Sequence, residues 1–474
     1  MKTENVSRTV LVAGVGAVLA ATALLYVPEL VGQGPPSPPG PAERAVIAAR
    51  AGAPAALPDL AALIADREQW VRAHPDDEAS WAELGAAYTE RGSRLGDVRD
   101  YPRAERALRR SLAERPAARG NPEAELGLGA LAGARGDWAT AREWGERVRK
   151  ADPRRWPVYP VLIDAYNGLG EYQAAQKAME SLEKLHAGPV VRARAAQAYR
   201  DRGWREDADA AALDAVALAE SAPEKAAALA RAGDLAWERG EPEEALGQYG
   251  AALRLVADHG PSLAGRARTL AALGRTEEAV RVWRAALSRL PLPEYLLDAG
   301  ELDESLGRAG DARALYERLR TGTWTGAEVP LGLLDADHGD AAAAVARMRA
   351  EWARGHRSVR VADALAWALH RAGASKEALG YAKRATEEGL RSALFLYHRG
   401  EIERALDLPG PARRHLEEAL RINPEFSPLD ARTAERSLAA LGELPDEVPA
   451  ELRREPAAKA TPPTAAPTRD GSSP

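Results

Sequence analysis

Residues 233–253 have the sequence GDLAWERGEPEEALGQYGAAL, and this stretch carries the pattern that decides the fold. Two segments with apolar residues at helical spacing flank Gly240, and Ala245 follows the glycine by five residues. A glycine between two such segments ends the first helix, because it can adopt a left-handed conformation without a side-chain penalty. The stretch therefore predicts two helices joined by a tight turn, with Ala245 starting the buried face of the second helix.

The same pattern recurs along the chain. Ten alanines follow one another at intervals of 32 to 37 residues: Ala104, Ala141, Ala175, Ala208, Ala245, Ala279, Ala312, Ala344, Ala378 and Ala412. Eight of them have a glycine five residues earlier: Gly136, Gly170, Gly203, Gly240, Gly274, Gly307, Gly339 and Gly373. A period near 34 residues with a fixed internal glycine is typical of stacked helical hairpins, each of which packs on its neighbours. We refer to these alanines as the repeat alanines.

Other positions of the repeat agree with an all-α fold between residues 55 and 441, with no strand. A small residue in each first helix should let the second helix approach: Gly85, Gly129, Gly233, Gly300, Gly332 and Gly400. Amphipathic segments at Asp59–Arg72 and Asp430–Leu441 should cap the array at its two ends. The residues inserted at 93–99 are expected to form a loop between two helices, either as part of a binding face or as tolerated variation in length.

The first full repeat contains Trp81-x-x-Leu84-Gly85-x-x-Tyr88, the signature W-x2-L-G-x2-Y of the tetratricopeptide repeat. The chain thus resembles the tetratricopeptide repeat (TPR) family. Its preference for arginine over lysine is typical of a bacterial sequence, and its apolar amino-terminal segment predicts a membrane-anchored member. The resemblance implies a right-handed superhelical solenoid of about ten hairpins with capping helices. It also implies that the first helices line a concave groove that binds other proteins.

The amino-terminal region has the composition of a membrane anchor. Thr9 to Val27 is an uncharged stretch of 19 residues, close to the length that spans a bilayer, and Lys2 and Arg8 precede it. We therefore expect a cytoplasmic tail (1–8), a transmembrane helix (9–27), a Pro/Gly-rich linker (28–54), an extracytoplasmic solenoid (55–441) and a disordered Pro/Ala/Thr tail (442–474). The alternative is a signal peptide cleaved near Ala21-Thr22-Ala23, which would release a secreted protein.

Composition and motifs narrow the function. The 64 basic and 70 acidic residues give a net charge of -6, which argues against a nucleic-acid partner. The sequence has no cysteine and no phosphate-loop, H-E-x-x-H or G-x-S-x-G motif, so we expect neither catalysis nor a cofactor or metal. One alternative is a metal-dependent protein that uses the late histidines, which are His338, His356, His370, His398 and His415.

Two tryptophans depart from the repeat pattern. Tyr166 and Tyr199 lie nine residues before their repeat alanines, where the family packs an aromatic ring, whereas Trp237 and Trp367 lie one residue after and two before that position. Their rings should then face the groove, unless they fill packing between repeats. Candidate partner-binding residues on similar faces are Asp234, Trp237, Arg268, Glu301, Glu304, Trp367, His370, Tyr397, Glu401 and Arg404.

These observations predict a membrane-anchored scaffold that binds a protein or peptide partner in its groove, and they leave its oligomeric state open. Aromatic and arginine side chains ringed by charge are typical of such binding surfaces. An alternative is a chaperone-like assembly factor for envelope or secreted proteins, which the sequence does not separate from the scaffold.

Overall fold

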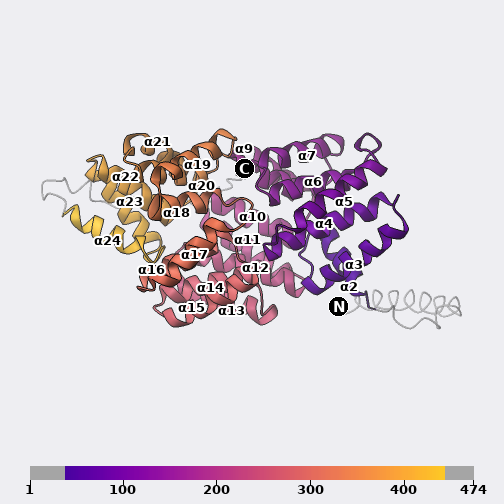
Figure 1. Ribbon diagram of the computed structural model, residues 1–474, viewed down its shortest axis with the longest axis horizontal. Helices are drawn as coiled ribbons and strands as arrows, with labels where there is room; N and C mark the ends of the chain where they lie inside the picture. Colours follow the sequence, from indigo (N-terminus) through magenta and orange to yellow (C-terminus); the bar gives the residue numbers. More distant parts are fainter. Residues whose placement is uncertain (1–37, 443–474) are drawn as a thin grey trace, which may run out of the picture.

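The computed structural model describes residues 38–442, and its regular structure is helical throughout this range. These residues form 23 α-helices and one short 3-10 helix, Ala117–Arg119, and they contain no strand (Figure 1). The all-α class predicted from the sequence is therefore confirmed for this part of the chain. The predicted tail at 1–8, anchor at 9–27 and tail at 443–474 lie outside the described residues.

Twenty of the helices pair into ten successive hairpins, the number predicted from the repeat alanines. The pairs are α4 (Glu78–Leu95) with α5 (Asp100–Glu114), α6 (Pro122–Ala134) with α7 (Trp138–Ala151), α8 (Val158–Leu169) with α9 (Tyr172–Leu185), α10 (Pro189–Asp201) with α11 (Arg205–Leu218), α12 (Ala222–Glu238) with α13 (Pro242–Leu255), α14 (Gly260–Ala272) with α15 (Thr276–Arg289), α16 (Pro293–Ser305) with α17 (Ala309–Thr321), α18 (Glu328–His338) with α19 (Ala341–Ala353), α20 (Val359–Arg371) with α21 (Ser375–Glu387), and α22 (Ala393–Ala405) with α23 (Pro409–Ile422). Helices α2 (Pro41–Ala51) and α3 (Leu57–Ala73) precede these hairpins, and α24 (Asp430–Ala440) follows them. The right hand of the superhelix stays a prediction.

The repeat alanines are packing positions, as the sequence predicted. All ten are buried, with exposed fractions between 0 and 6%. In five hairpins the residue four positions after the alanine lies against a first-helix glycine, where a Cβ would collide with it. These pairs are Gly85 with Leu108, Gly233 with Tyr249, Gly300 with Tyr316, Gly332 with Met348, and Gly400 with Leu416. In each of these five hairpins one large side chain therefore occupies the space that the glycine leaves open.

The turn glycines also agree with the sequence, with one exception. Seven of the eight have φ between 71° and 82°, the left-handed region that ends a helix. At Gly339 the prediction is wrong, because φ is −145° and ψ is −137°, so the residue that ends α18 is not left-handed. The turn between α18 and α19 therefore differs in backbone conformation from the other seven glycine turns.

Two segments are more helical than the sequence indicated. Residues 41–51, expected to belong to a linker, form α2, whose Ala45 is buried. Arg44 of this helix donates to Asp59 of α3 at 2.9 Å, which ties the two helices together. The insertion at 93–99 is taken up in part by α4, which continues through Leu95 before a short turn leads into α5.

The predicted localisation must be corrected. Among residues 38–442 no helix has both the length and the apolar character needed to cross a membrane. The stretch from Thr9 to Val27, on which a single-pass membrane protein with extracytoplasmic repeats was predicted, lies outside the described residues. The structure therefore gives no support to that localisation.

The array winds tightly enough for its successive turns to touch. In Figure 1, α20 lies beside α9 after the chain has passed through the helices from α10 to α19, and a hydrogen bond joins the two helices. Hydrogen bonds join residues 186 to 191 positions apart: Thr325 Oγ1 donates to the Ala134 carbonyl (3.3 Å), Val359 N to the Tyr172 hydroxyl (2.7 Å), and Asn423 Nδ2 to the Trp237 carbonyl (2.9 Å). This spacing is about five and a half repeats of 34 residues. We call these contacts the seam.

Candidate functional site

The concave face of the array is formed by the first helices of the hairpins. Consecutive first helices contact one another directly, and between α8 and α10 Arg194 donates a hydrogen bond to Asp164, whereas consecutive second helices among the described residues make no comparable contacts. An array whose members approach more closely on one side curves toward that side. The first helices thus line the inner surface, as the family resemblance implied.

Polar side chains form a ladder along this inner surface. A side chain on one first helix is repeatedly paired with a side chain on the next. The pairs are Arg231 with Gln197 (2.8 Å), Arg200 with Glu238 (2.6 Å), Arg268 with Asp298 (2.7 Å), and Trp367 with Asp337 (3.0 Å). The ladder satisfies most charges of the concave face internally and leaves few groups free to bind a partner.

Glu301 is an exception to this pairing. It lies on α16 among four other carboxylates, Asp298, Glu304, Asp337 and Asp430, and we call these five residues the acidic cluster. Within residues 38–442 its carboxylate has neither a hydrogen-bond nor an ion-pair partner. The residue is half-buried in the concave face. Burial, followed by the charges of the other four, raises the pKa of Glu301 well above its usual range. The concave face therefore holds uncompensated negative character at this point.

The other members of the acidic cluster have neutral or cationic partners. Glu304 accepts a hydrogen bond from the Tyr316 hydroxyl at 2.8 Å, and Asp430 accepts one from Ser427 at 3.1 Å. Asp298 and Asp337 are held in the ladder. These bonds fix the positions of the carboxylates whose charges act on Glu301, so the negative character of this region does not depend on a rearrangement of their side chains.

Aromatic rings extend the concave face beyond the acidic cluster. The Trp367 ring stacks on His398 at 4.2 Å, and Tyr397 and His370 lie 5.7 and 5.2 Å from it. The structure thus brings together three residues that the sequence predicted separately, Trp367, His370 and Tyr397. It adds His398, which the sequence analysis had considered only as a metal ligand.

The two tryptophans are more buried than a groove-facing role requires. Trp237 is 8% exposed and packs on Ala236, Ala245 and Tyr249, and Trp367 is 4% exposed. This burial agrees with the alternative that they fill packing between repeats. Whether either ring contacts a partner stays a prediction.

The remaining candidates lie on the same face but are engaged within the chain. Asp234 accepts a hydrogen bond from the Tyr249 hydroxyl at 2.8 Å, and Arg404 pairs with Glu401 at 2.8 Å. Glu401 is buried, and its Oε1 has no partner among the described residues. His370 contacts Ser375 at 3.0 Å, and burial lowers its pKa to about 4.

Sequence reasoning missed three members of the acidic cluster. Asp298 lies three residues before Glu301 and Glu304 three residues after it, so all three share one face of α16, and this spacing was a usable signal. Asp337 is the second-last residue of α18, and its approach to Glu301 depends on how α18 stacks on α16. The sequence could not predict that Asp430 lies near Glu301, because this proximity depends on how α24 packs against the array.

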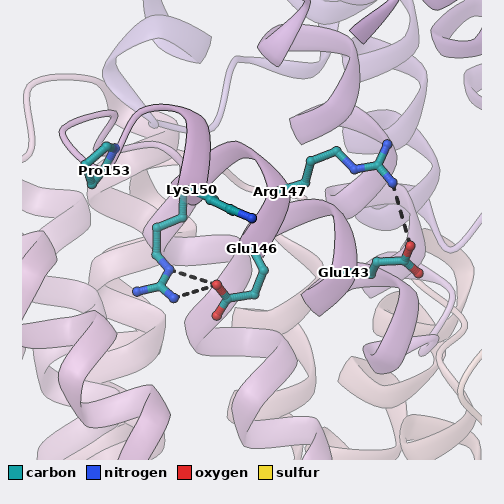
Figure 2. Close-up of a pocket in the computed structure, with 6 residues that line it drawn as sticks. Glu143, Glu146, Arg147, Lys150 and Pro153 are labelled. Carbon is teal, nitrogen blue, oxygen red and sulfur yellow. Dashed lines mark hydrogen bonds and ion pairs between the residues drawn. The ribbon is translucent and has the colours of Figure 1, made fainter. Parts of the chain in front are cut away.

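A cleft on α7 offers a contrast. It has a volume of about 590 Å³ and is lined by Glu143, Glu146, Arg147, Arg149, Lys150 and Pro153 (Figure 2). Its glutamates are paired: Arg149 donates to Glu146 at 2.6 Å, and Arg147 lies 3.7 Å from Glu143. Such exposed pairs on one helix contribute little to stability, and the remaining charged residue of the cleft, Lys150, is exposed to solvent and therefore well hydrated.

The late histidines have partners of their own. His356 contacts Glu351 at 2.5 Å, His398 contacts Asp363 at 2.9 Å, and His415 contacts Glu403 at 2.6 Å. In the described part of the chain no group of three or more His, Asp or Glu residues is placed to hold a metal ion. The alternative of a metal-dependent protein therefore has no site to rest on in these residues.

Comparison with known proteins gives the following picture. No family model matches the chain, and no curated protein matches its sequence. Among solved structures, a tetratricopeptide repeat protein from Parabacteroides merdae aligns over 53% of this chain and 98% of its own, with 19% identity and a TM-score of 0.33. The human IFIT1 dimer with PPP-AAAA aligns over 72% of this chain and 82% of its own, with 14% identity and a TM-score of 0.43. Yeast Tom70 aligns over 76% of this chain and 96% of its own, with 13% identity and a TM-score of 0.32.

These likenesses concern the fold alone and leave membrane anchoring and bacterial origin undecided. The repeat length, the ten hairpins and the residues Trp81, Leu84, Gly85 and Tyr88 come from the chain itself. On these features the chain resembles the tetratricopeptide repeat family.

Proposed function

We propose that the chain is an interaction scaffold that holds a protein or peptide partner against its concave face, without catalysis. The observation that carries this proposal is Glu301, a carboxylate in the concave face with no partner among the described residues and four carboxylates around it. Such a group costs stability in the free protein, and a cation from a partner would remove that cost.

The chemistry of the acidic cluster favours a basic segment of the partner. Lysine or arginine side chains would neutralise Glu301 and reach the carboxylates around it, and the ladder would hold those carboxylates in position. Because the first helices form a continuous inner surface, an extended segment could contact several hairpins at once. Binding would then combine charge with shape, and it would weaken as salt is added.

A binding measurement on the full chain tests this proposal. The probe is a fluorescein-labelled peptide of the sequence RRLRRLR, compared with its counterpart EELEELE, with fluorescence anisotropy as the readout. We expect the basic peptide to bind and the acidic one not to. Glu301→Gln should weaken binding about tenfold, the effect of losing roughly 1.4 kcal/mol.

Glu243→Gln is the matched control, because Glu243 is exposed on the second helix α13 and has no partner in the described residues. It should bind the basic peptide as the unmodified protein does. Equal affinity for the two peptides, or equal effects of the two substitutions, would contradict the proposal.

A further inference from the structure

A narrow cleft on the outer side of the array holds a carboxylate that has no hydrogen-bond or ion-pair partner among the described residues. The cleft lies between the second helices α15 and α17, with α16 at its floor, and has a volume of about 200 Å³. This is well above the ~10–15 Å³ that one water molecule needs. Val280, Leu287, Leu302 and Leu315 form apolar walls. Asp303 and Arg284 also line the cleft, and the two make no ion pair with each other.

Asp303 is the unneutralised group. Its side chain makes no hydrogen bond or ion pair within residues 38–442, its Oδ1 is buried without a partner, and the residue is 8% exposed. Burial and then the neighbouring charge of Asp311 raise the pKa of Asp303, against the opposing charges of Arg308 and Arg284. A buried carboxylate in this state is destabilising unless a cation reaches it.

Two other hairpins have an acidic residue at the same position of the repeat, and they show how it is neutralised there. Asp303 lies nine residues before the repeat alanine Ala312, and two later hairpins also have an acidic residue there, Asp335 and Glu403. Each of those is paired with a cationic side chain three residues after its repeat alanine. Asp335 accepts from Arg347 at 3.4 Å, and Glu403 contacts His415 at 2.6 Å.

In the hairpin of Asp303 that third position is Leu315. The chain therefore keeps the acidic residue, replaces the cation that would neutralise it by an apolar wall, and leaves a cleft where the cation would lie. This combination is specific to α16 and α17 among the three hairpins with an acidic residue at this position.

We propose that this cleft is a second binding site, which accepts an arginine side chain from a protein partner on the outer face of the array. The alkyl part of the arginine would lie along Leu287, Leu302 and Leu315, as long cationic side chains do on apolar surface. Its guanidinium would donate to Asp303 at the floor and to Asp311 at the edge. A planar group with several donors suits two carboxylates better than a compact ammonium does.

Ligand-detected saturation-transfer NMR with the full chain tests this site. The probe is N-acetyl-arginine methylamide, compared with its citrulline analogue, which has the same shape without the charge. The arginine probe should bind, and the citrulline probe should bind at least about tenfold more weakly, as expected for losing a charge-assisted hydrogen bond. Free arginine that binds better than the blocked probe would instead indicate a small-molecule ligand and overturn the assignment to a protein side chain.

Two substitutions address the site from opposite directions. Asp303→Asn removes the charge, and Leu315→Arg supplies the cation within the chain, as Arg347 does for Asp335. Both should abolish binding of the probe, and Leu315→Arg should raise the melting temperature while it does so. If Asp303→Asn fails to fold, Leu315→Arg still decides the question. Binding that persists in Leu315→Arg at the unmodified affinity would overturn the proposal.

Two controls separate this site from the concave face. Glu243→Gln should bind the arginine probe normally. Glu301→Gln should also bind it normally, since Glu301 lies on the inner surface. Loss of the probe in Glu301→Gln but not in Asp303→Asn would place the arginine in the acidic cluster, and the outer site would then be wrong while the proposed function stands.

Discussion

Single glycines in the first helices are required by contacts that large side chains of the second helices make. Gly300 is an example, because the ring of Tyr316 lies where a side chain at position 300 would begin. Tyr316 is itself fixed by the hydrogen bond from its hydroxyl to Glu304, so the ring cannot move aside freely. Two neighbouring side chains therefore limit what this position accepts.

Gly300→Ala should destabilise the protein by about 1–3 kcal/mol, the usual cost of overpacking a core. Gly247→Ala is its matched control, since Gly247 also lies within a helix but has nothing within 4 Å of the added methyl group. There the higher helix propensity of alanine should stabilise the protein by up to about 1 kcal/mol. Thermal unfolding followed by circular dichroism measures both changes, and shifts of the same sign would refute this account.

At the scale of residues, the sequence predicted what the repeat imposes and missed what departs from it. The repeat alanines and turn glycines recur ten and eight times, so their packing role is visible without a structure. Asp303 has counterparts in Asp335 and Glu403, but that it is buried without a partner is visible only in the structure. That Glu301 has no partner among the described residues is likewise visible only there. Trp237 and Trp367 were noticed as departures, but whether a departing ring is exposed depends on the next hairpin.

At the scale of elements, the last hairpins are joined by buried pairs of a histidine with a carboxylate. His398 of α22 contacts Asp363 of α20, so this pair links two consecutive first helices across the inner surface. The residues lie 35 positions apart, and only the stacking of the hairpins brings them together. The sequence located the histidines in separate helices and could not pair them for this reason.

The pair His398–Asp363 should make stability depend on pH. Burial lowers the pKa of His398, but the charge and hydrogen bonding of Asp363, helped by Asp430 and Asp337, outweigh burial and raise it above the ordinary 6.5. The stabilisation is therefore fully present below about pH 6.5 and is lost as the pH rises through the folded-state value. His398→Gln should consequently lower the melting temperature more at pH 5.5 than at pH 9.

Asp363→Asn provides the second arm of this measurement, because it removes the other half of the pair. It should flatten the same part of the pH profile. An equal loss of stability from His398→Gln at both pH values would mean that the ring contributes packing alone, mainly its stacking on Trp367.

At the scale of the whole molecule, the seam adds contacts between hairpins that lie about one superhelical turn apart. Each hairpin of an ordinary solenoid contacts only its sequence neighbours. Here the turn at Gly170 meets the backbone of Arg357, and the turn at Gly203 approaches that of Gly389. The number of hairpins could be predicted from the sequence, but the pitch that creates the seam could not, because it results from small rotations between hairpins that add up over one turn.

The seam gives the turn glycines two different roles, which substitution can separate. Gly170 and Gly307 are both left-handed, so alanine at either should cost about 1–2 kcal/mol from the backbone alone. At Gly307 nothing lies within 4 Å of the new methyl group, whereas at Gly170 it would collide with the carbonyl oxygen of Arg357. Gly170→Ala should therefore lower the melting temperature further than Gly307→Ala does.

Small-angle X-ray scattering then tells whether the seam itself has opened. A methyl group at position 170 should push the two turns of the array apart, so the radius of gyration of Gly170→Ala should exceed that of Gly307→Ala. Gly203→Ala should behave like Gly170→Ala, because its methyl would lie 2.6 Å from the Gly389 carbonyl oxygen. If all three variants lost stability equally and kept the scattering profile of the unmodified protein, the seam would not determine how far apart the turns of the array lie. A larger radius in the two seam variants alone would mean that the width of the concave face is set by contacts between turns as well as by the hairpins that line it.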